Sequence, residues 1–275
     1  LLLFRCGDFY ETYGEDALTA SKVLGIVLTK RSNAAPDSIP MAGFPHHSLE
    51  TYLPRLVRAG YKVAVCDQLE DPKLTKKIVK RGITELVTPG IAFSDQLLEQ
   101  KEHNYLAGLT FHKDRVGAAF LDVSTGSFQV AEGSLDYIGT LLSSFAPKEL
   151  LVARGYEKGT RERFGDSFYI STLDEWAFVY DNAVERLKRQ LKVDSLKGFA
   201  IDSFPLGVTS AGALLIYLEH TQHTDLSNIC SISRIDEGTF VWMDRFTFRN
   251  LEIFASTAGK EGTSLVEVMD KCSSP

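Results

Sequence analysis

The fold of the first part of this chain is decided by residues 1–11, LLLFRCGDFYE. An apolar run leads to Gly7, and an acid, two aromatic rings and a second acid follow. This order predicts a short strand over residues 2–6 that ends at the glycine. Residues i and i+2 of an extended segment point to the same side, so we expect Phe9 and Glu11 to face one way and Tyr10 the other.

Phe9 and Glu11 allow two interpretations. Aromatic residues are mostly buried, so residues 7–11 taken alone favour a core aromatic beside a solvated carboxylate. An aromatic at a strand end can instead be an apolar wedge for a stack of bases, and a carboxylate on the same side can meet a base edge. We expect Tyr10, on the opposite side, to anchor the strand to the core.

Length and composition indicate a multidomain globular protein. The chain has 275 residues, which corresponds to about two domains, and its hydrophobic (44%) and charged (24%) contents are ordinary. No apolar run is long enough for a membrane span, and no signal pattern is present. The four cysteines are far apart, which indicates free thiols in a reducing cytosol. Because the chain opens on Leu1 and ends at Pro275 without a finished element, we interpret it as part of a longer protein.

The charge is unevenly distributed. The net charge is −6, but residues 1–90 hold 12 Lys and Arg against 10 Asp and Glu, while the remainder holds 18 against 26. Local patches rather than net charge decide contact with phosphates, so the overall acidity does not exclude nucleic acid. Residues 73–81 (KLTKKIVKR) hold five basic residues and no acid. They suit either a phosphate backbone or a solvated helix face.

Residues 1–90 alternate strand and helix patterns and predict an α/β domain with a mixed sheet. Helices are predicted at residues 14–24 and 48–59, and Pro54 is expected to bend or break the second. Residues 32–45 hold three prolines and predict a long loop.

The rest of the chain predicts a second α/β unit and then helices. Residues 91–103 are polar and predict a linker. In residues 104–200 a meander of three strands precedes alternating helices and strands, an order similar to that of ribonuclease H. Residues 201–275 are expected to begin a helical domain, with a first helix at 207–220. The predicted fold class is therefore multidomain α/β.

Three further residues are candidates for the same site as Phe9. Lys30 and Arg31 stand at a predicted strand end and suit phosphates or a minor groove, and Met41 is an apolar residue in the predicted loop. Proteins that kink DNA from the minor groove combine an apolar wedge with flanking basic residues. The plainer interpretations are a solvated loop for Lys30 and Arg31 and core filling for Met41.

These residues lie in four stretches that resemble the mismatch-recognition domain of the MutS family of DNA mismatch-repair proteins. The stretches are FRCGDFYE (4–11), LTKR (28–31), IPMAGFPHH (39–47) and VTPG (87–90), and their order and spacing match as well. More weakly, the second unit is similar to the connector domain of that family. Residues 235–236 and 249–252 are similar to the start of its lever and core domain.

The resemblance implies roles for the matched positions. Phe9 would stack on the mispaired base from the minor groove, and Glu11 would form a hydrogen bond with that base. Asp8, Arg31 and Met41 would lie at the DNA beside it. A mismatched step is easier to unstack and bend, so such a wedge would sense deformability rather than sequence.

The resemblance also implies partners and cofactors. The partners would be mismatched double-stranded DNA, MutL through the connector domain, and a second copy of the full-length protein, in the cytoplasm at the nucleoid. ATP and Mg would belong to an ATPase outside residues 1–275, which contain no G-x-x-x-x-G-K-[ST] motif. No enzymatic activity, metal or cofactor is expected of these residues themselves.

Two other classes of function stay open. A metal-dependent nuclease acting on branched DNA would need several carboxylates around Asp122, and the neighbouring predicted strands offer none beside it. A protein-interaction fragment of a relative that no longer senses mismatches is the second class, and the intact pair of Phe9 and Glu11 argues against it. The adjacent His46 and His47 point apart in a chain and are not expected to bind a metal.

Overall fold

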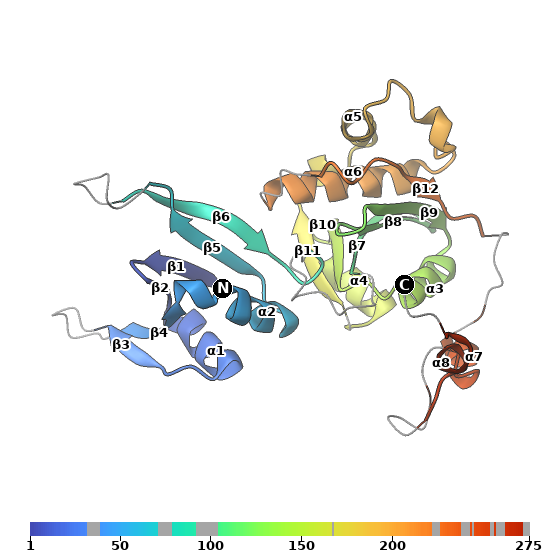
Figure 1. The fold of residues 1–275 in the computed structure, drawn as a ribbon. Coiled ribbons are helices and arrows are strands. Elements are labelled where there is room, and N and C mark those ends of the chain that lie inside the picture. Colours follow the sequence, from blue (N-terminus) through green and yellow to red (C-terminus); the bar gives the residue numbers. More distant parts are fainter. Residues whose placement is uncertain are drawn as a thin grey trace.

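The structure is a computed structural model that describes residues 1–31, 39–70, 79–91, 104–166, 168–221, 226–237, 243, 245–253, 256 and 262–271. Two α/β units make up most of these residues, and each is built on a mixed sheet of six strands (Figure 1). The multidomain α/β class predicted from the sequence is therefore confirmed.

The first sheet has the strand order β3-β4-β2-β1-β5-β6. Its strands are β1 (Leu2–Cys6), β2 (Phe9–Tyr13), β3 (Thr29–Arg31), β4 (Ile39–Pro45), β5 (Val63–Gln68) and β6 (Arg81–Val87). β1 and β5 run parallel, and the other neighbouring pairs are antiparallel. The opening stretch of the chain thus forms the middle of this sheet.

Helices α1 (Gly14–Leu24) and α2 (Leu49–Arg58) pack on one face of the first sheet. Burial alternates along β2, so that its second and fourth residues lie in the core and its first, third and fifth lie on the opposite face. The core on the helix side includes Leu3, Leu24, Phe44, Leu56 and Val65. The other face of β2 is therefore available to carry functional side chains.

The two predictions for this unit that rest on proline had different outcomes. α2 continues through the buried Pro54, so the proline does not break the helix, and the expected bend stays a prediction. The prediction of a loop at Pro40 and Pro45 was wrong. Residues 39–45 form β4 and not a loop. Pro40 and Pro45 stand near the two ends of β4, where a missing N–H disturbs the sheet least. The abundance of proline in this segment had therefore indicated the wrong element.

The second sheet has the strand order β11-β10-β7-β8-β9-β12. β7 (Tyr105–His112), β8 (Arg115–Asp122) and β9 (Ser127–Gly133) form the predicted antiparallel meander. β7, β10 (Glu149–Ala153) and β11 (Tyr169–Leu173) are parallel neighbours, and the short β12 (Ser233–Arg234) runs parallel to β9. The likeness to ribonuclease H itself stays a prediction.

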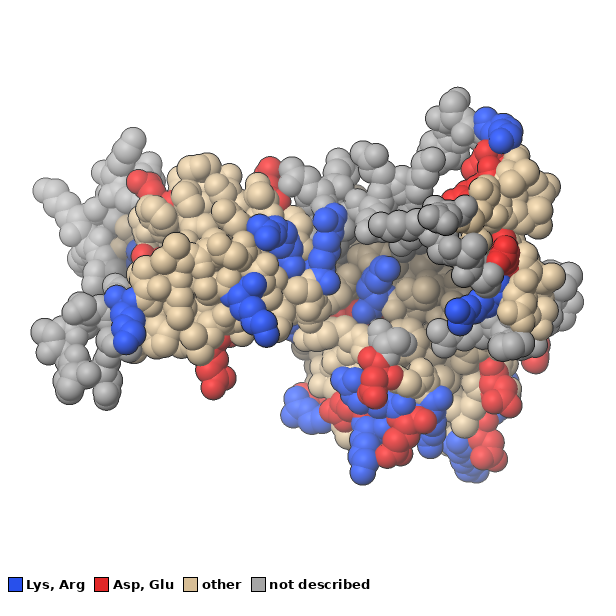
Figure 2. Space-filling view, turned by 90° about the horizontal axis from the view of Figure 1, so that it is seen from below, with Lys and Arg blue, Asp and Glu red and all other residues tan. Residues whose placement is uncertain are grey.

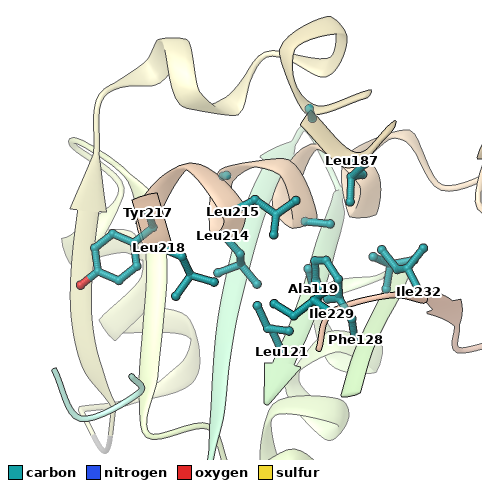
Figure 3. Packing of buried hydrophobic residues seen from close by; sticks show 14 of the residues in the cluster. Ala119, Leu121, Phe128, Leu187, Leu214, Leu215, Tyr217, Leu218, Ile229 and Ile232 are labelled. Carbon is teal, nitrogen blue, oxygen red and sulfur yellow. The ribbon is translucent and has the colours of Figure 1, made fainter. Parts of the chain in front are cut away.

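Helices cover both faces of the second sheet (Figure 1). α3 (Leu135–Phe145) packs on one face of the sheet, and α6 (Pro205–His220) packs on the other. α5 (Tyr180–Leu191) packs on α6. α4 (Glu157–Phe164) lies between β10 and β11 in the sequence. Figure 3 shows Leu214 and Leu218 extending from the side of α6 that faces the sheet, and Leu121 and Phe128 belong to the same buried cluster. Residues 207–218 of α6 are all buried, because the second sheet packs on one side of this helix and α5 packs on another.

The residues after α6 stay with the second unit for a further stretch. β12 joins the second sheet, and Ile235 is buried in the core beneath α3. Two short helices, α7 (Arg245–Asn250) and α8 (Leu265–Met269), follow. The sequence had placed a domain boundary at residue 201, and the domain boundaries stay predictions. Within the part of the chain that is described, no helix is both long and apolar enough to cross a membrane.

A buried carboxylate joins the two units. Glu149, the first residue of β10, is fully buried. Its Oε2 accepts hydrogen bonds from Thr88 Oγ1 at 2.6 Å and from the backbone N–H of Gly90 at 3.0 Å, both just beyond the first sheet. Its Oε1 accepts hydrogen bonds from Ser171 Oγ on β11 and from Tyr217 OH on α6, the latter at 2.7 Å. These donors compensate the cost of taking a charge out of water.

Lys62 and Ile91 reinforce the junction from the first unit. Lys62 Nζ donates a hydrogen bond to Tyr217 OH at 3.3 Å and lies 5.2 Å from the centre of that ring. Burial lowers the pKa of the Lys62 ammonium, and the Glu149 carboxylate opposes this effect. Ile91 is fully buried within the core of the second unit. The two units are therefore held by polar and apolar contacts together.

We expect Glu149→Ala to lower the free energy of unfolding of residues 1–275 by about 3–5 kcal/mol, because it leaves buried donors without an acceptor. Glu149→Gln should cost less, since its oxygen still accepts and its N–H groups can donate to the hydroxyls. Glu162→Ala removes an exposed carboxylate of α4 and is the matched control. Urea unfolding followed by circular dichroism measures all three. If Glu149→Ala unfolds at the same urea concentration as the control, the junction does not depend on this carboxylate.

Candidate nucleic-acid interface

A tight hairpin positions the first candidate residues. β1 and β2 pair with Cys6 opposite Phe9, so Gly7 and Asp8 alone form the turn. Gly7 has a φ of +59°, which two-residue hairpin turns of this kind require and which other residues rarely adopt. Phe9 is the first residue after the turn, and its strand is paired on both sides, with β1 and with β4. The backbone that presents Phe9 is therefore fixed.

The hairpin presents Phe9 to solvent. Phe9 is 48% exposed, whereas its neighbour Tyr10 is 2% exposed. Glu11 lies on the same face as Phe9 and is half-buried. The expectation that Phe9 and Glu11 share a side while Tyr10 points into the core is confirmed. The interpretation as a core aromatic holds for Tyr10 and fails for Phe9.

Tyr10 anchors the hairpin to the rest of the first unit. Its hydroxyl donates a hydrogen bond to Asp67 Oδ2 on β5 at 2.7 Å. The guanidinium of Arg5 lies 5.6 Å from the centre of the Tyr10 ring and 3.4 Å from Asp67 Oδ1. Burial, and after it the hydrogen bond to Asp67, raise the pKa of Tyr10 to about 12. The hydroxyl therefore remains a donor at neutral pH.

The other candidates lie further from Phe9. Met41 is half-buried and pairs with Tyr13, four residues along β2 from Phe9, which corresponds to ~13 Å of strand. Lys30 is exposed on the edge strand β3, opposite Pro40. Arg31 follows it at the end of β3, and its side chain lies outside what the structure describes. The fold thus gathers Asp8, Phe9 and Glu11 at one end of the sheet and Met41 and Lys30 at the other.

His46 braces the turn that holds Asp8. The exposed Asp8 accepts a hydrogen bond at its backbone oxygen from the N–H of His46 at 2.8 Å, and His46 Nδ1 lies 3.1 Å from the same oxygen. Of the basic segment 73–81, only the last residues are described, and Lys80 there pairs with Glu70 at 3.4 Å. Residues 73–78 and the predicted linker from residue 92 to 103 lie outside the described residues.

Comparison with known proteins identifies the family to which the chain belongs. A family model described as MutS domain I matches residues 1–96, and one described as MutS domain II matches residues 104–230. The chain belongs to the MutS family. This confirms the resemblance inferred from the four stretches of sequence.

Relatives of known name share the whole length of the chain. Proteins named DNA mismatch repair protein MutS are 54% identical in Parabacteroides distasonis, 53% in Phocaeicola vulgatus and 51% in Flavobacterium psychrophilum. Each comparison covers 100% of this chain and 32% of the relative. The chain therefore spans about a third of the length of these curated relatives.

Sequence reasoning missed three residues of MutS domain I that lie beside Glu11. The hydroxyl of Tyr13 donates a hydrogen bond to Glu11 Oε2, and Cys6 Sγ lies 3.6 Å from the same hydroxyl. Gly43 pairs with Glu11 on β4, and a Cβ there would come within 2.9 Å of the Tyr10 carbonyl oxygen. The alternation that predicted a shared face for Phe9 and Glu11 extends to Tyr13 and could have found it.

Asp122 in MutS domain II shapes a turn. It is buried, and its Oδ1 accepts hydrogen bonds from Ser124 N–H at 3.0 Å and Ser124 Oγ at 2.6 Å. These bonds support the turn that leads through Gly126 into β9. Among the described residues, no group of three His, Cys, Asp or Glu is placed to hold a metal ion. The carboxylate cluster that a nuclease would need is thus not found in that part of the chain.

The two MutS domains differ in how charge is spread over the face shown in Figure 2. The first unit, on the left, presents mostly uncharged surface with scattered Lys, Arg, Asp and Glu side chains. The second unit, at the lower right, presents Lys, Arg, Asp and Glu close together. On this face, charged side chains are therefore sparser over the first unit than over the second.

We expect the stability that Tyr10 contributes to fall as the pH rises from about 10 to 12. An unfolded tyrosine loses its proton near pH 10, and Tyr10 in the folded protein keeps it up to about 12. The folded state therefore binds more protons in this window, so raising the pH favours unfolding. The urea midpoint of the wild type should approach that of Tyr10→Phe over this range. Tyr180→Phe, at an exposed tyrosine, is the control. A constant difference between wild type and Tyr10→Phe would contradict the assigned anchoring role.

Proposed function

We propose that this chain recognises mispaired or looped DNA in DNA mismatch repair by placing Phe9 between base steps from the minor groove, with a kink in the duplex at that point. The observation that carries the proposal is the 48% exposure of Phe9 on a hairpin whose backbone is fixed on both sides. The names of the relatives support the process, and the position of the ring supports the mechanism.

The energy balance makes such a wedge sensitive to weakened pairing. Unstacking a base step costs a few kcal/mol, and stacking of a base on an aromatic ring returns ~1–3 kcal/mol. The two contributions are close, so a matched step resists the wedge and a mismatched step, which is already easier to bend, accepts it. An aromatic on a pre-formed turn loses little conformational freedom on insertion, which favours this outcome further.

Glu11 is proposed to provide discrimination and not affinity. It lies on the same face as Phe9, so it reaches the same base step. A carboxylate close to DNA phosphates is unfavourable unless a donor on a base meets it. A matched base uses its donors within the pair, whereas a mispaired base can offer one. Repulsion between Glu11 and the phosphates therefore weakens binding to matched DNA, and a hydrogen bond with the base compensates this repulsion only at a mismatch.

Asp8, Lys30, Arg31 and Met41 are proposed to lie along the DNA on either side of the wedge. Asp8 flanks Phe9 in the turn, and the other three stand at the far end of the sheet. The separation of ~13 Å along β2 suits contact with a different part of a duplex. A kinked duplex follows more of the protein surface than a straight one, which brings such distant residues into reach.

For the whole protein we propose the roles that the MutS family suggests. It would form a homodimer with an ATPase that uses ATP and Mg, and it would contact MutL through MutS domain II. For the domain boundaries we propose residues 1–90, a linker at 91–103, and a second unit that extends from 104 beyond Ile235, since β12 pairs with β9. The lever and core domain would then begin after that strand.

Phe9→Ala should abolish the preference of the full-length protein for a G·T mismatch over a matched duplex. Loss of one aromatic stacking partner corresponds to about a 5- to 150-fold change in Kd for the mismatch. The matched control is Trp176→Ala, an aromatic of equal exposure in MutS domain II. Fluorescence anisotropy with both duplexes measures the ratio. A Phe9→Ala protein that keeps the wild-type ratio would disprove the wedge.

Glu11→Ala should lower the ratio of mismatched to matched affinity mainly by tightening the binding of the matched duplex. The expected change in the ratio is roughly 10-fold, the value of one hydrogen bond to a charged group. Glu50→Ala, at an exposed acid of α2, is the control for the loss of one negative charge. Uniform tightening of both duplexes would show that Glu11 only repels phosphates.

A further inference from the structure

The side chain of Glu11 has a protein partner on its own strand. The hydroxyl of Tyr13 donates a hydrogen bond to Glu11 Oε2. Cys6 Sγ lies 3.6 Å from the Tyr13 oxygen, and because Tyr13 already donates to Glu11, the thiol is the donor in that contact. Cys6, Tyr13 and Glu11 thus form a chain of hydrogen bonds on the face that presents Phe9. Successive bonds of this kind polarise one another.

The position of the Tyr13 ring is determined by the backbone on both sides of it. Tyr13 is the last residue of β2, where it pairs with Met41 on β4. The next residue, Gly14, has a φ of +62° and begins α1. A residue between a paired strand and a helix cannot shift along the chain without breaking one of them. The hydroxyl is therefore delivered to one place beside Glu11.

The hydroxyl of Tyr13 is kept in its donor form. Burial, followed by the contacts with Glu11 and Cys6, raises the pKa of Tyr13 above its ordinary value. At neutral pH the phenol is protonated and the carboxylate is the acceptor. A carboxylate can accept about four hydrogen bonds, so accepting one from Tyr13 is compatible with accepting another from a base.

We propose that Tyr13 is a positioning residue that determines mismatch specificity by holding the Glu11 carboxylate in one orientation before DNA binds. This inference rests on the proposed function, because it assumes that Glu11 forms a hydrogen bond with a mispaired base. An unrestrained glutamate side chain has three rotatable bonds, and it loses conformational entropy when it forms a hydrogen bond with a base. A glutamate held by Tyr13 has already lost this entropy on folding, so its contact with a base costs less free energy on binding.

The plainer alternative is that Tyr13 merely fills the junction between β2 and α1. The two roles make different demands on the side chain. Filling the junction needs the ring, whereas positioning Glu11 needs the hydroxyl. Tyr13→Phe keeps the ring and removes the hydroxyl, so this variant separates the packing role from the positioning role. Its effect should also depend on Glu11, which a packing role would not.

The test is a double-mutant cycle in the full-length protein. Wild type, Tyr13→Phe, Glu11→Ala and the double variant are compared for Kd on a G·T-mismatched and a matched duplex, with Phe9→Ala in parallel. We expect Tyr13→Phe to lower the ratio of mismatched to matched affinity by about 2- to 10-fold, the equivalent of ordering one side chain. In the Glu11→Ala background the same change should have no effect. Tyr61→Phe, at an exposed tyrosine of the same domain, is the control.

Each outcome bears on the proposal. An unchanged ratio in Tyr13→Phe overturns it, and so does a loss that persists when Glu11 is already absent. Both results leave the wedge intact if Phe9→Ala still loses the preference. If Phe9→Ala keeps the preference, the proposed function fails and this inference fails with it. A thermal unfolding midpoint for Tyr13→Phe equal to that of the wild type excludes a purely structural explanation of a lowered ratio.

Discussion

The rest of the structure depends on one buried carboxylate, that of Glu149. An ionised group without access to water is strongly unfavourable unless donors surround it. Here the donors come from the segment after β6, from β11 and from α6, which lie far apart in the sequence. Separating the two MutS domains would remove the Thr88 and Gly90 donors and expose Ile91. The domains are therefore joined by hydrogen bonds and an apolar contact that their separation would break.

The same principle acts on a smaller scale within MutS domain I. The Asp67 carboxylate accepts a hydrogen bond from the Tyr10 hydroxyl and forms a salt bridge with the Arg5 guanidinium. These three residues come from β5, β2 and β1, so they connect the Phe9 hairpin to the middle of the sheet. Through the Glu149 junction the hairpin is then fixed with respect to MutS domain II. In the proposed mechanism, a ring held in this way would lose little freedom on entering DNA, and more of the stacking energy would be left for binding.

The sequence predicted those features that depend on neighbouring residues. Alternation along β2 placed Phe9 and Glu11 on one face and Tyr10 on the other, because the period of a strand is two. The apolar spacing of residues 14–24 gave α1 with the observed bounds. Failures came where distant residues decide. β4 forms despite its prolines because β2 and β3 pair with it on its two sides. α6 is buried on all sides because the second sheet and α5 both pack against it.

The candidate site depended on more than neighbouring residues. Residues 7–11 taken alone favour a core aromatic and a solvated carboxylate, and Phe9 and Glu11 became candidates through the resemblance carried by the four stretches. Their roles at DNA stay predictions. Tyr13 was missed although its partner Glu11 is only two residues away, because the alternation along β2 was not followed to the end of the strand. Glu149 was missed because none of its four donors is near it in the sequence, and a single Glu at the start of a strand usually faces water.

The order of the two aromatic residues follows from their chemistry. Tyr10 has a hydroxyl that needs a partner when buried, and Asp67 provides it. Phe9 has no polar atom, so it can leave water for a base stack without giving up a hydrogen bond. A slip of one residue in the β1–β2 register would exchange their faces, exposing Tyr10 and bringing Phe9 to Asp67. The turn at Gly7, with its positive φ, and the pairing of Cys6 with Phe9 prevent that slip. The glycine that opens the motif thus decides which of the two rings is exposed to solvent.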